Sequence, residues 1–359
     1  MIFRRSLVRE FAISALGVFL VLLGIMLTTQ LVRFLGQAAS GAITSQAVVT
    51  LMGLAALGYM PILLSLTLFI AVLMVLTRSY HDHEMVVWFS SGLSLTAWVR
   101  PVLIFAMPLV LTVAVLSLLL TPWAISKSDD FRRQLDNRSD VALVAPGVFR
   151  ESKHADRVYF VESVSPDAKT VSNVFVSSTQ HGKNGVMVAR SGYTETMPNG
   201  DRFLVLVNGR RYEGTPGTSE YKVMTFEHYG IRIESYESAQ DQPSPKALST
   251  LALLSKPTPP NLAELSWRIG LPVSALLLAL LAIPLSFVNP RAGRSLNLIL
   301  AILIYVIYNN VISVAQAWIA EGRISLAIGV WGVHAAMFVI LLLLFYRRLT
   351  LFSVWRLFR

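Results

Sequence analysis

The chain has 359 residues, of which 54% are hydrophobic and only 14% are charged, whereas soluble domains carry about 25% charged residues. This composition indicates a membrane protein, and the lack of cysteine excludes disulfide bonds, thiolate metal sites and a cysteine nucleophile. The formal net charge is +10, but residues 127–268 hold 18 Lys and Arg against 17 Asp and Glu, so most of the excess flanks apolar segments. This distribution is typical of membrane anchoring and argues against a nucleic-acid partner.

Six runs without Asp, Glu, Lys or Arg are long enough to cross a membrane, since one crossing helix needs about 20 residues. The sequence therefore predicts a polytopic α-helical membrane protein with three transmembrane helices before and three after a polar insert. The predicted helices cover about 12–32, 48–76, 101–122, 268–288, 296–318 and 325–346.

The first segment, MIFRRSLVREF (1–11), alternates apolar and charged residues. This pattern predicts an amphipathic helix that lies on the membrane surface. The apolar run that follows is too long for the hydrophobic part of a signal peptide, so we interpret it as a retained first transmembrane helix.

The loop after the second predicted span contains RSYHDHEMVVW (78–88), in which two histidines and two carboxylates are consecutive. One interpretation is a metal site. However, His81 and His83 would lie on opposite sides of a helix, and the sequence has no HExxH pattern, which places two histidines on one helical face. We therefore expect no metal and no cofactor. A second interpretation is the solvated start of a helix, where Asp82 and Glu84 interact favourably with the helix dipole.

A third interpretation is a docking helix at about 80–91 for a cytoplasmic partner. Acids lie at its start, and a Ser-Gly pair at 91–92 marks its end. No segment matches the nucleotide-binding motif GxxxxGK[ST], and the predicted cytoplasmic segments are too short for a nucleotide-binding domain. Energy for active transport would have to come from a partner ATPase. The apolar face of the docking helix consists of Met85, Val86, Trp88 and Phe89.

The insert at 127–262 is predicted to be an all-β domain of the sandwich or jelly-roll type. Val, Phe, Tyr and Ile are frequent, several segments alternate apolar and polar residues, and turn sequences such as PNGD (198–201) separate them. We expect about eight short strands and a stiff linker at KPTPPN (256–261). The chain thus divides into a helical part at 1–126, the β-domain, and a helical part with a short tail at 263–359.

The arginines predict the orientation in the membrane. If the amino end is inside, the inner segments hold eleven arginines and the short outer loops hold two, Arg33 and Arg323. Because basic loops stay in the cytoplasm, both termini are predicted to be cytoplasmic and the β-domain periplasmic, in a bacterial inner membrane. The inner arginines are Arg4, Arg5, Arg9, Arg78, Arg100, Arg291, Arg294, Arg347, Arg348, Arg356 and Arg359.

His334 is the one side chain in the apolar runs that ionises near neutral pH. Ion-coupled transporters and intramembrane enzymes place ionisable groups at membrane depth, so a packed or hydrogen-bonded histidine is the simpler interpretation. The residues leave three functions open: a transport subunit driven by a partner ATPase, an intramembrane enzyme, and a scaffold or regulator of an ATPase that transports nothing. We predict the non-enzymatic transport subunit.

Several long motifs are shared with one known family. They resemble the lipopolysaccharide-export permeases of the LptF/LptG type, and more closely the LptF type, whereas the β-domain agrees by position and class alone. The motifs are MIFRRSLVREF (1–11), LTRSYHDHEMVVWFSSGLS (76–94), ELSWRIGLPVSALLLALLAIPLSFVNPRAGRS (264–295), AWIAEGRIS (317–325) and GVWGVHAAMF (329–338).

The resemblance implies a set of partners. Two permeases, one of the LptF and one of the LptG type, form a heterodimer that joins two copies of the cytoplasmic ATPase LptB. Such a complex extracts lipopolysaccharide from the inner membrane and, with LptC, passes it to a periplasmic jelly-roll bridge towards the outer membrane.

The resemblance also implies a coupling site in the loop after the second span. In the family this loop forms a helix that sits in a groove of the ATPase, and Glu84 matches its acidic residue. Tyr80 and Met85 match the pattern as well, and Trp88 and Phe89 belong to the same predicted helix. The two histidines are not part of the pattern.

The family's substrate cavity lies between the two permeases and is gated by the first and fifth spans. Arg33 matches a basic position near the phosphorylated lipid head, or it is a snorkelling anchor at the interface. The amides of the fifth span either contact substrate or hydrogen-bond to neighbouring helices. Arg268 and Arg291 fall within family motifs, and Arg268 equally suits an interface anchor. The candidates on the fifth span are Tyr305, Tyr308, Asn309, Asn310, Gln316 and Trp318.

Overall fold

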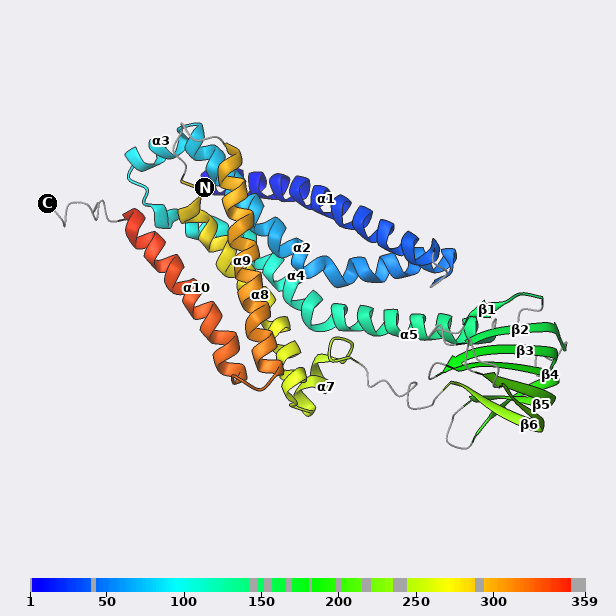
Figure 1. Cartoon of the computed structure of the whole chain (residues 1–359). Helices are drawn as coiled ribbons and strands as arrows, with labels where there is room; N and C mark the ends of the chain where they lie inside the picture. Colours follow the sequence, from blue (N-terminus) through cyan, green and yellow to red (C-terminus); the bar gives the residue numbers. More distant parts are fainter. Residues whose placement is uncertain are drawn as a thin grey trace. The chain divides into compact units, whose positions relative to one another are not determined.

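The computed structural model divides into two compact units, and each is described by itself (Figure 1). We call residues 1–130 together with 243–359 the membrane unit, and residues 131–242 the β-unit. The structure describes residues 2–39, 43–141, 147–151, 157–165, 170–180, 183–197, 202–214, 221–234, 244–287 and 294–349.

Six helices of the described chain are long and apolar enough to cross a membrane, which confirms the predicted number. The predicted surface helix and the first span form one continuous helix, since no proline interrupts residues 2–39. The third span is a rod of four consecutive elements, η1, α4, η2 and α5. The helices are α1 (Ile2–Ala39), α2 (Ser45–His81), α3 (Glu84–Ser90), η1 (Leu95–Trp98), α4 (Val99–Val115), η2 (Leu116–Leu120), α5 (Thr121–Val141), α7 (Thr250–Ser255), α8 (Pro259–Leu285), α9 (Arg294–Ala320) and α10 (Leu326–Leu349).

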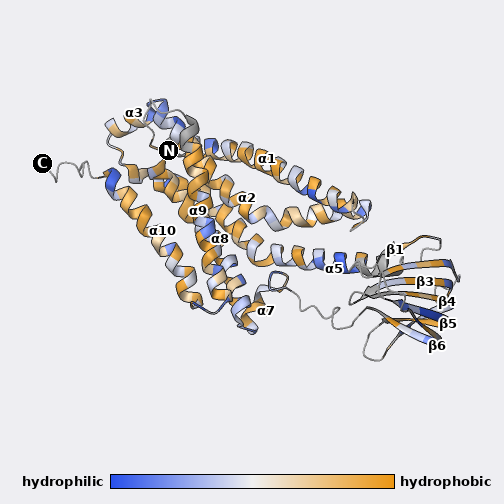
Figure 2. Ribbon diagram, viewed as in Figure 1, coloured by the Kyte–Doolittle hydropathy of each residue, from blue (hydrophilic) through white to orange (hydrophobic). Residues whose placement is uncertain are grey.

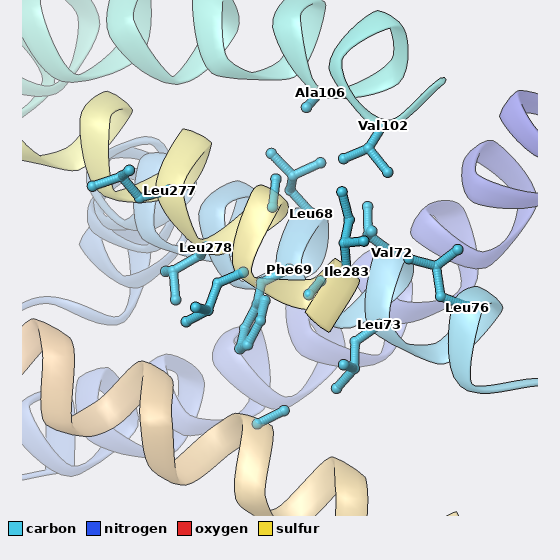
Figure 3. Packing of buried hydrophobic residues seen from close by; sticks show 14 of the residues in the cluster. Leu68, Phe69, Val72, Leu73, Leu76, Val102, Ala106, Leu277, Leu278 and Ile283 are labelled. Atoms are coloured by element: carbon cyan, nitrogen blue, oxygen red, sulfur yellow. The ribbon is translucent and has the colours of Figure 1, made fainter. Parts of the chain in front are cut away.

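Helices α2 and α8 form the centre of the membrane unit. Helix α8 packs against α2, α4, α9 and α10, and its Ala275, Ala279 and Ala282 are fully buried. Small residues let membrane helices approach closely and gain van der Waals contact. The surrounding core is apolar (Figure 3), and its labelled members are Leu68, Phe69, Val72, Leu73, Leu76, Val102, Ala106, Leu277, Leu278 and Ile283.

The peripheral helices α1, α9 and α10 expose many large apolar side chains. Their ribbons are mostly coloured as hydrophobic over the membrane-crossing length (Figure 2). Extended exposed apolar surface indicates contact with lipid or with another membrane protein. The membrane unit therefore has a packed centre and an apolar outer surface that favours contact with lipid or protein over water.

The β-unit contains one antiparallel sheet in which each strand pairs with the next along the chain. Its buried face carries Val, Leu, Met and Ile side chains that form one cluster. The predicted fold class, six membrane helices with an inserted all-β domain, is confirmed. The strands are β1 (Arg150–Glu151), β2 (Arg157–Val164), β3 (Thr170–Gln180), β4 (Lys183–Thr196), β5 (Arg202–Gly214) and β6 (Tyr221–Glu234).

Pairing within the sheet is interrupted along one row that crosses β2 to β6. In β3 and β5 this row holds Asn173 and Asn208, whose φ angles of 50° and 54° lie in the left-handed region, which asparagine tolerates better than most residues. The pairs on either side keep the same register: Val207 faces His228 on one side, and Gly209 faces its β6 partner on the other. The register of the strands therefore does not shift at this row.

This row also changes which side chains face the interior. In β4 the buried Met187 and Ala189 are followed by Gly192 as the next buried position after the row, and in β5 the buried Leu204, Val205 and Leu206 are followed by Gly209. When the alternation of buried and exposed positions breaks in the middle of a strand, the sequence pattern resembles that of two short strands. The sequence predicted about eight short strands, whereas the described residues form five strands of 8 to 14 residues and the two-residue β1.

Candidate functional site

The predicted docking segment forms a sharp turn followed by a short helix. Helix α2 ends at His81, and His83 then adopts a left-handed conformation with φ of 58°, which redirects the chain into α3. Glu84 begins α3, where its carboxylate faces the favourable end of the helix dipole. Gly92, with φ of 87°, turns the chain again after α3. We call α3, the residues that contact it and the further residues linked to it through Arg78 or Tyr80 the α3 junction.

Arg78 is the electrostatic centre of the α3 junction. Its guanidinium donates to Glu10 of α1 (Nη2 to Oε2, 2.7 Å), to Glu84 (Nη1 to Oε1, 3.1 Å) and, at a longer 3.4 Å, to Asp82. The Arg78 side chain is 41% exposed, so water screens these pairs. The carboxylate of Glu84 is thus held towards its own chain and fixes the start of α3 against α1 and α2.

The predicted apolar face of α3 is divided between two directions. Met85 is 1% exposed and lies in the membrane unit's core, and Trp88 packs against that core. Val86 and Val87 are 61% and 66% exposed, and Phe89 is 38% exposed. Met85 and Trp88 therefore anchor the helix, while the surface that a partner can reach consists of Val86, Val87 and Phe89.

Aromatic rings connect the α3 junction to three further elements. Tyr80 lies edge-on to Phe287, just beyond α8, with ring centroids 5.5 Å apart, and its ring is 6.3 Å from Phe89. Phe89 in turn lies 5.6 Å from Trp98 of η1. The guanidinium of Arg348, in the last turn of α10, sits 4.1 Å from the centroid of Phe287, within reach of a cation–π interaction. The end of α2 therefore contacts α3 directly, and the ends of α8 and α10 are linked to it through Tyr80 and Phe287.

Sequence reasoning missed four members of the α3 junction: Glu10, Arg78, Phe287 and Arg348. One signal was available for Glu10 and Arg78. Outside 127–268 the chain has four acids, and three of them, Glu10, Asp82 and Glu84, surround Arg78. Phe287 and Arg348 lie far apart in the sequence, so that only the fold reveals their contact.

His81 and His83 have different surroundings in the structure. His81 contacts the carboxylate of its neighbour Asp82 (Nδ1 to Oδ1, 3.0 Å), and His83 forms the turn. Among the residues that the structure describes, no group of three or more His, Asp or Glu is arranged to hold a metal ion.

The tyrosines predicted as substrate contacts face the interior of the chain. Tyr305 is buried and donates its hydroxyl to the backbone oxygen of Ile62 in α2 (3.2 Å). Tyr308 is buried and shares a 2.6 Å hydrogen bond with Nδ1 of His334 in α10. Gly270 of α8 makes room for this histidine, because a Cβ there would lie 3.2 Å from its Nε2. These contacts hold α9 and α10 to the central helices, as predicted for a packed His334.

The other candidates on α1 and α9 are less buried. Asn309 and Asn310 donate their amides to backbone oxygens one turn earlier in α9, at 3.0 Å and 2.8 Å, and so bond within their helix. Gln316 is half-buried, Trp318 is about half-exposed, and Arg33 of α1 is exposed. These positions, unlike the two tyrosines, are open to a ligand or a partner helix.

Arg268 lies in the interior of the membrane unit, where it is 2% exposed and pairs with Glu264 (Nε to Oε1, 2.9 Å). Its guanidinium is therefore enclosed by the chain and does not extend to the surface as a snorkelling side chain does. Arg291 lies outside the described residues.

Comparisons with known proteins agree on one family. The family model for the lipopolysaccharide export system permease LptF/LptG matches residues 5–347. The lipopolysaccharide export system permease protein LptF of Escherichia coli K12 is 30% identical over 337 residues, which cover 93% of this chain and 92% of that protein. LptF of Shigella flexneri shows the same identity and coverage.

Proposed function

Because the chain belongs to the LptF/LptG family of lipopolysaccharide export permeases, we propose that it is a non-enzymatic subunit of an ATP-driven exporter. A dimer of the cytoplasmic ATPase LptB supplies the energy, and a second permease, LptG, completes the membrane part. Closure of the ATPase on ATP pushes α3, and the cavity between the permeases narrows and expels lipopolysaccharide towards the LptC-containing periplasmic bridge.

The observation that carries this proposal is the two-sided environment of α3. Val86 and Val87 are exposed for a partner, whereas Met85 on the same helix is fixed in the core. A force on the exposed side therefore reaches the packed helices directly. The resemblance assigned Glu84 to the ATPase contact, and its bond to Arg78 adds a second role, which is to hold α3 in place.

The orientation is part of the proposal: both termini and α3 are cytoplasmic, and the β-unit is periplasmic. The excess of arginine in the inner segments supports it. Contacts support it as well, because Glu10 near the start of α1, Arg78 near the end of α2, Phe287 after α8 and Arg348 at the end of α10 gather at one end of the membrane unit. An alternating path of six spans places these four positions on the same side.

We assign the substrate path to the outward surfaces of α1 and α9. Both helices expose apolar side chains along most of their length, which suits either lipid acyl chains or the second permease. Arg33 offers a positive charge for a phosphorylated lipid head, and Gln316 and Asn309 offer amides further along the path. Tyr305 and Tyr308 hold α9 in position and do not contact substrate.

The β-unit receives the lipid and joins the bridge. Among the described strands β6 pairs with β5 alone, so its outer edge has free backbone groups along 14 residues. Such an edge can accept a strand from a neighbouring sheet. This supports end-to-end joining with the sheet of a periplasmic partner.

The test places a charge on the surface proposed to bind the ATPase. Val87→Glu should reduce the LptB that co-purifies with the permeases at least tenfold, because a carboxylate cannot be buried unpaired in an apolar contact. Its matched control is Leu254→Glu, which changes a similarly exposed apolar residue on the short helix α7 and should leave co-purification unchanged. Normal LptB binding by Val87→Glu would contradict the proposed docking surface.

A further inference from the structure

Four oxygen atoms from three segments surround the buried guanidinium of Arg268. Its Nε donates to Glu264 (2.9 Å) and its Nη1 donates to the hydroxyl of Thr250 (3.0 Å). Its Nη2 donates to the backbone oxygens of Pro245 (3.2 Å) and Lys246 (3.1 Å). We call Arg268 and these four partners the clasp. Each nitrogen of the guanidinium has a partner in the chain and four of its five N–H groups are used, so the clasp is chiefly an internal joint.

Two irregular helices extend the clasp to the third span. Pro272 has no N–H, so the backbone oxygen of Arg268 lacks its usual helical partner. The hydroxyl of Ser117 donates to that oxygen at 3.0 Å. Ser117 belongs to η2, a single π-helical turn, and Thr250 donates its hydroxyl to Leu118 in the same turn. π-Helical turns are rare and often lie at functional sites.

The clasp gathers both chain segments that lead to and from the β-unit. The outgoing chain runs from η2 into α5, and the returning chain enters the described residues at 244, directly before Pro245. Both are bonded to α8 within one turn of Arg268. At its other end α8 leads to Phe287, which contacts Tyr80 of the α3 junction. The part of α8 from Arg268 to Leu285 has 18 residues, about 26 Å at 1.5 Å per residue, and thus links the clasp to the α3 junction.

We propose that Arg268 is a positioning residue for export, which makes α8 the rod that carries movement from the α3 junction to both connections of the β-unit. A buried ion pair is weak evidence for stability, because apolar residues of similar size often replace it without loss. A guanidinium instead supplies several donors in a rigid fork, which fixes three segments at defined distances, whereas a lysine is a single flexible point charge. This inference rests on the proposed function.

The experiment compares transport with ATP hydrolysis in the assembled complex. Complexes with LptB and LptG are reconstituted into proteoliposomes containing lipopolysaccharide, and its ATP-dependent release to a periplasmic acceptor is measured beside the ATPase rate. For Arg268→Lys and for Thr250→Val we expect assembly and ATPase rates within about twofold of the unsubstituted complex. The lipopolysaccharide released per ATP should fall at least fivefold. Thr258→Val, a control whose hydroxyl makes no capping bond, should change neither quantity.

The possible outcomes distinguish failure of this inference from failure of the proposed function. If the unsubstituted complex releases no lipopolysaccharide with ATP, the proposed function fails and the inference falls with it. If that complex works and both variants release as much per ATP, the clasp does not transmit movement. If release falls only in proportion to lost assembly or lost ATPase, the clasp is merely structural. A selective fall in release per ATP, seen in both variants and not in the control, supports the inference.

Discussion

Arg78 and Arg268 each gather oxygen atoms from several segments, but in different surroundings. Arg78 is 41% exposed and meets three carboxylates whose side chains are 37–41% exposed. Arg268 is 2% exposed and meets one carboxylate, one hydroxyl and two backbone oxygens. The first arrangement has an excess of negative charge in water, and the second has balanced charge away from water.

This difference indicates different mechanical roles for the same side chain. Exposed ion pairs contribute little stability and can exchange partners, so the α3 junction is able to rearrange when a partner pushes on α3. Buried charges tolerate no unpaired state, so the clasp moves as one piece. We infer that the membrane unit has an adjustable end and a rigid end, and that α8 joins them.

The largest expected effect comes from leaving a charge unpaired at the rigid end. Arg268→Ala should lower the free energy of unfolding by about 3–5 kcal/mol, because Glu264 then stays buried without a partner. The double variant Arg268→Met with Glu264→Leu should recover most of this loss, since neither charge remains. Thermal unfolding of the purified chain in detergent measures both. A double variant as unstable as the single one would show that the remaining polar bonds, and not the charge, dominate the clasp.

At the adjustable end we expect a smaller loss of stability than at the rigid end. The effect on assembly with LptB should there exceed the effect on stability. Arg78→Ala should cost at most about 1 kcal/mol of stability, yet weaken LptB binding severalfold because Glu84 and α3 lose their restraint. Raising the salt from 0.1 M to 0.5 M should also weaken LptB binding by the unsubstituted chain, since salt shortens the screening length and so weakens the ion pairs of Arg78. The clasp should not respond to salt. Large destabilisation by Arg78→Ala would remove the distinction between the two ends.

The sequence predicted the rigid and adjustable ends to different degrees. Charge-free runs located all six spans, and the acids before an apolar segment located α3. The phase of a helix as short as α3 could not be derived, so Met85 and Trp88 were predicted to face a partner and instead face the core. The spacing of Glu264 and Arg268, four residues apart, is a readable helical pair. Their burial could not be predicted, because two of the other partners of Arg268 are backbone oxygens and the third, the hydroxyl of Thr250, is brought close only by the fold.

The β-unit also shows what the sequence pattern could and could not predict. Alternating apolar residues located its strands correctly, but the inward positions change at the row of Asn173 and Asn208. Asparagine is among the few residues that favour the left-handed conformation. Those two residues were therefore a readable sign that a strand continues through an apparent break.

The smallest expected effect concerns the turn that holds the carboxylates of Asp82 and Glu84 on either side of Arg78. His83 occupies the left-handed region there, which costs a residue with a side chain about 1 kcal/mol relative to glycine. His83→Gly should therefore leave the midpoint of thermal unfolding unchanged or raise it slightly, with LptB binding and export unaffected. His83→Ala also removes the imidazole but keeps the backbone cost, so it should be no more stable than the unsubstituted chain. Loss of export in both variants would mean that the imidazole itself acts, and would place His83 among the functional residues of the α3 junction.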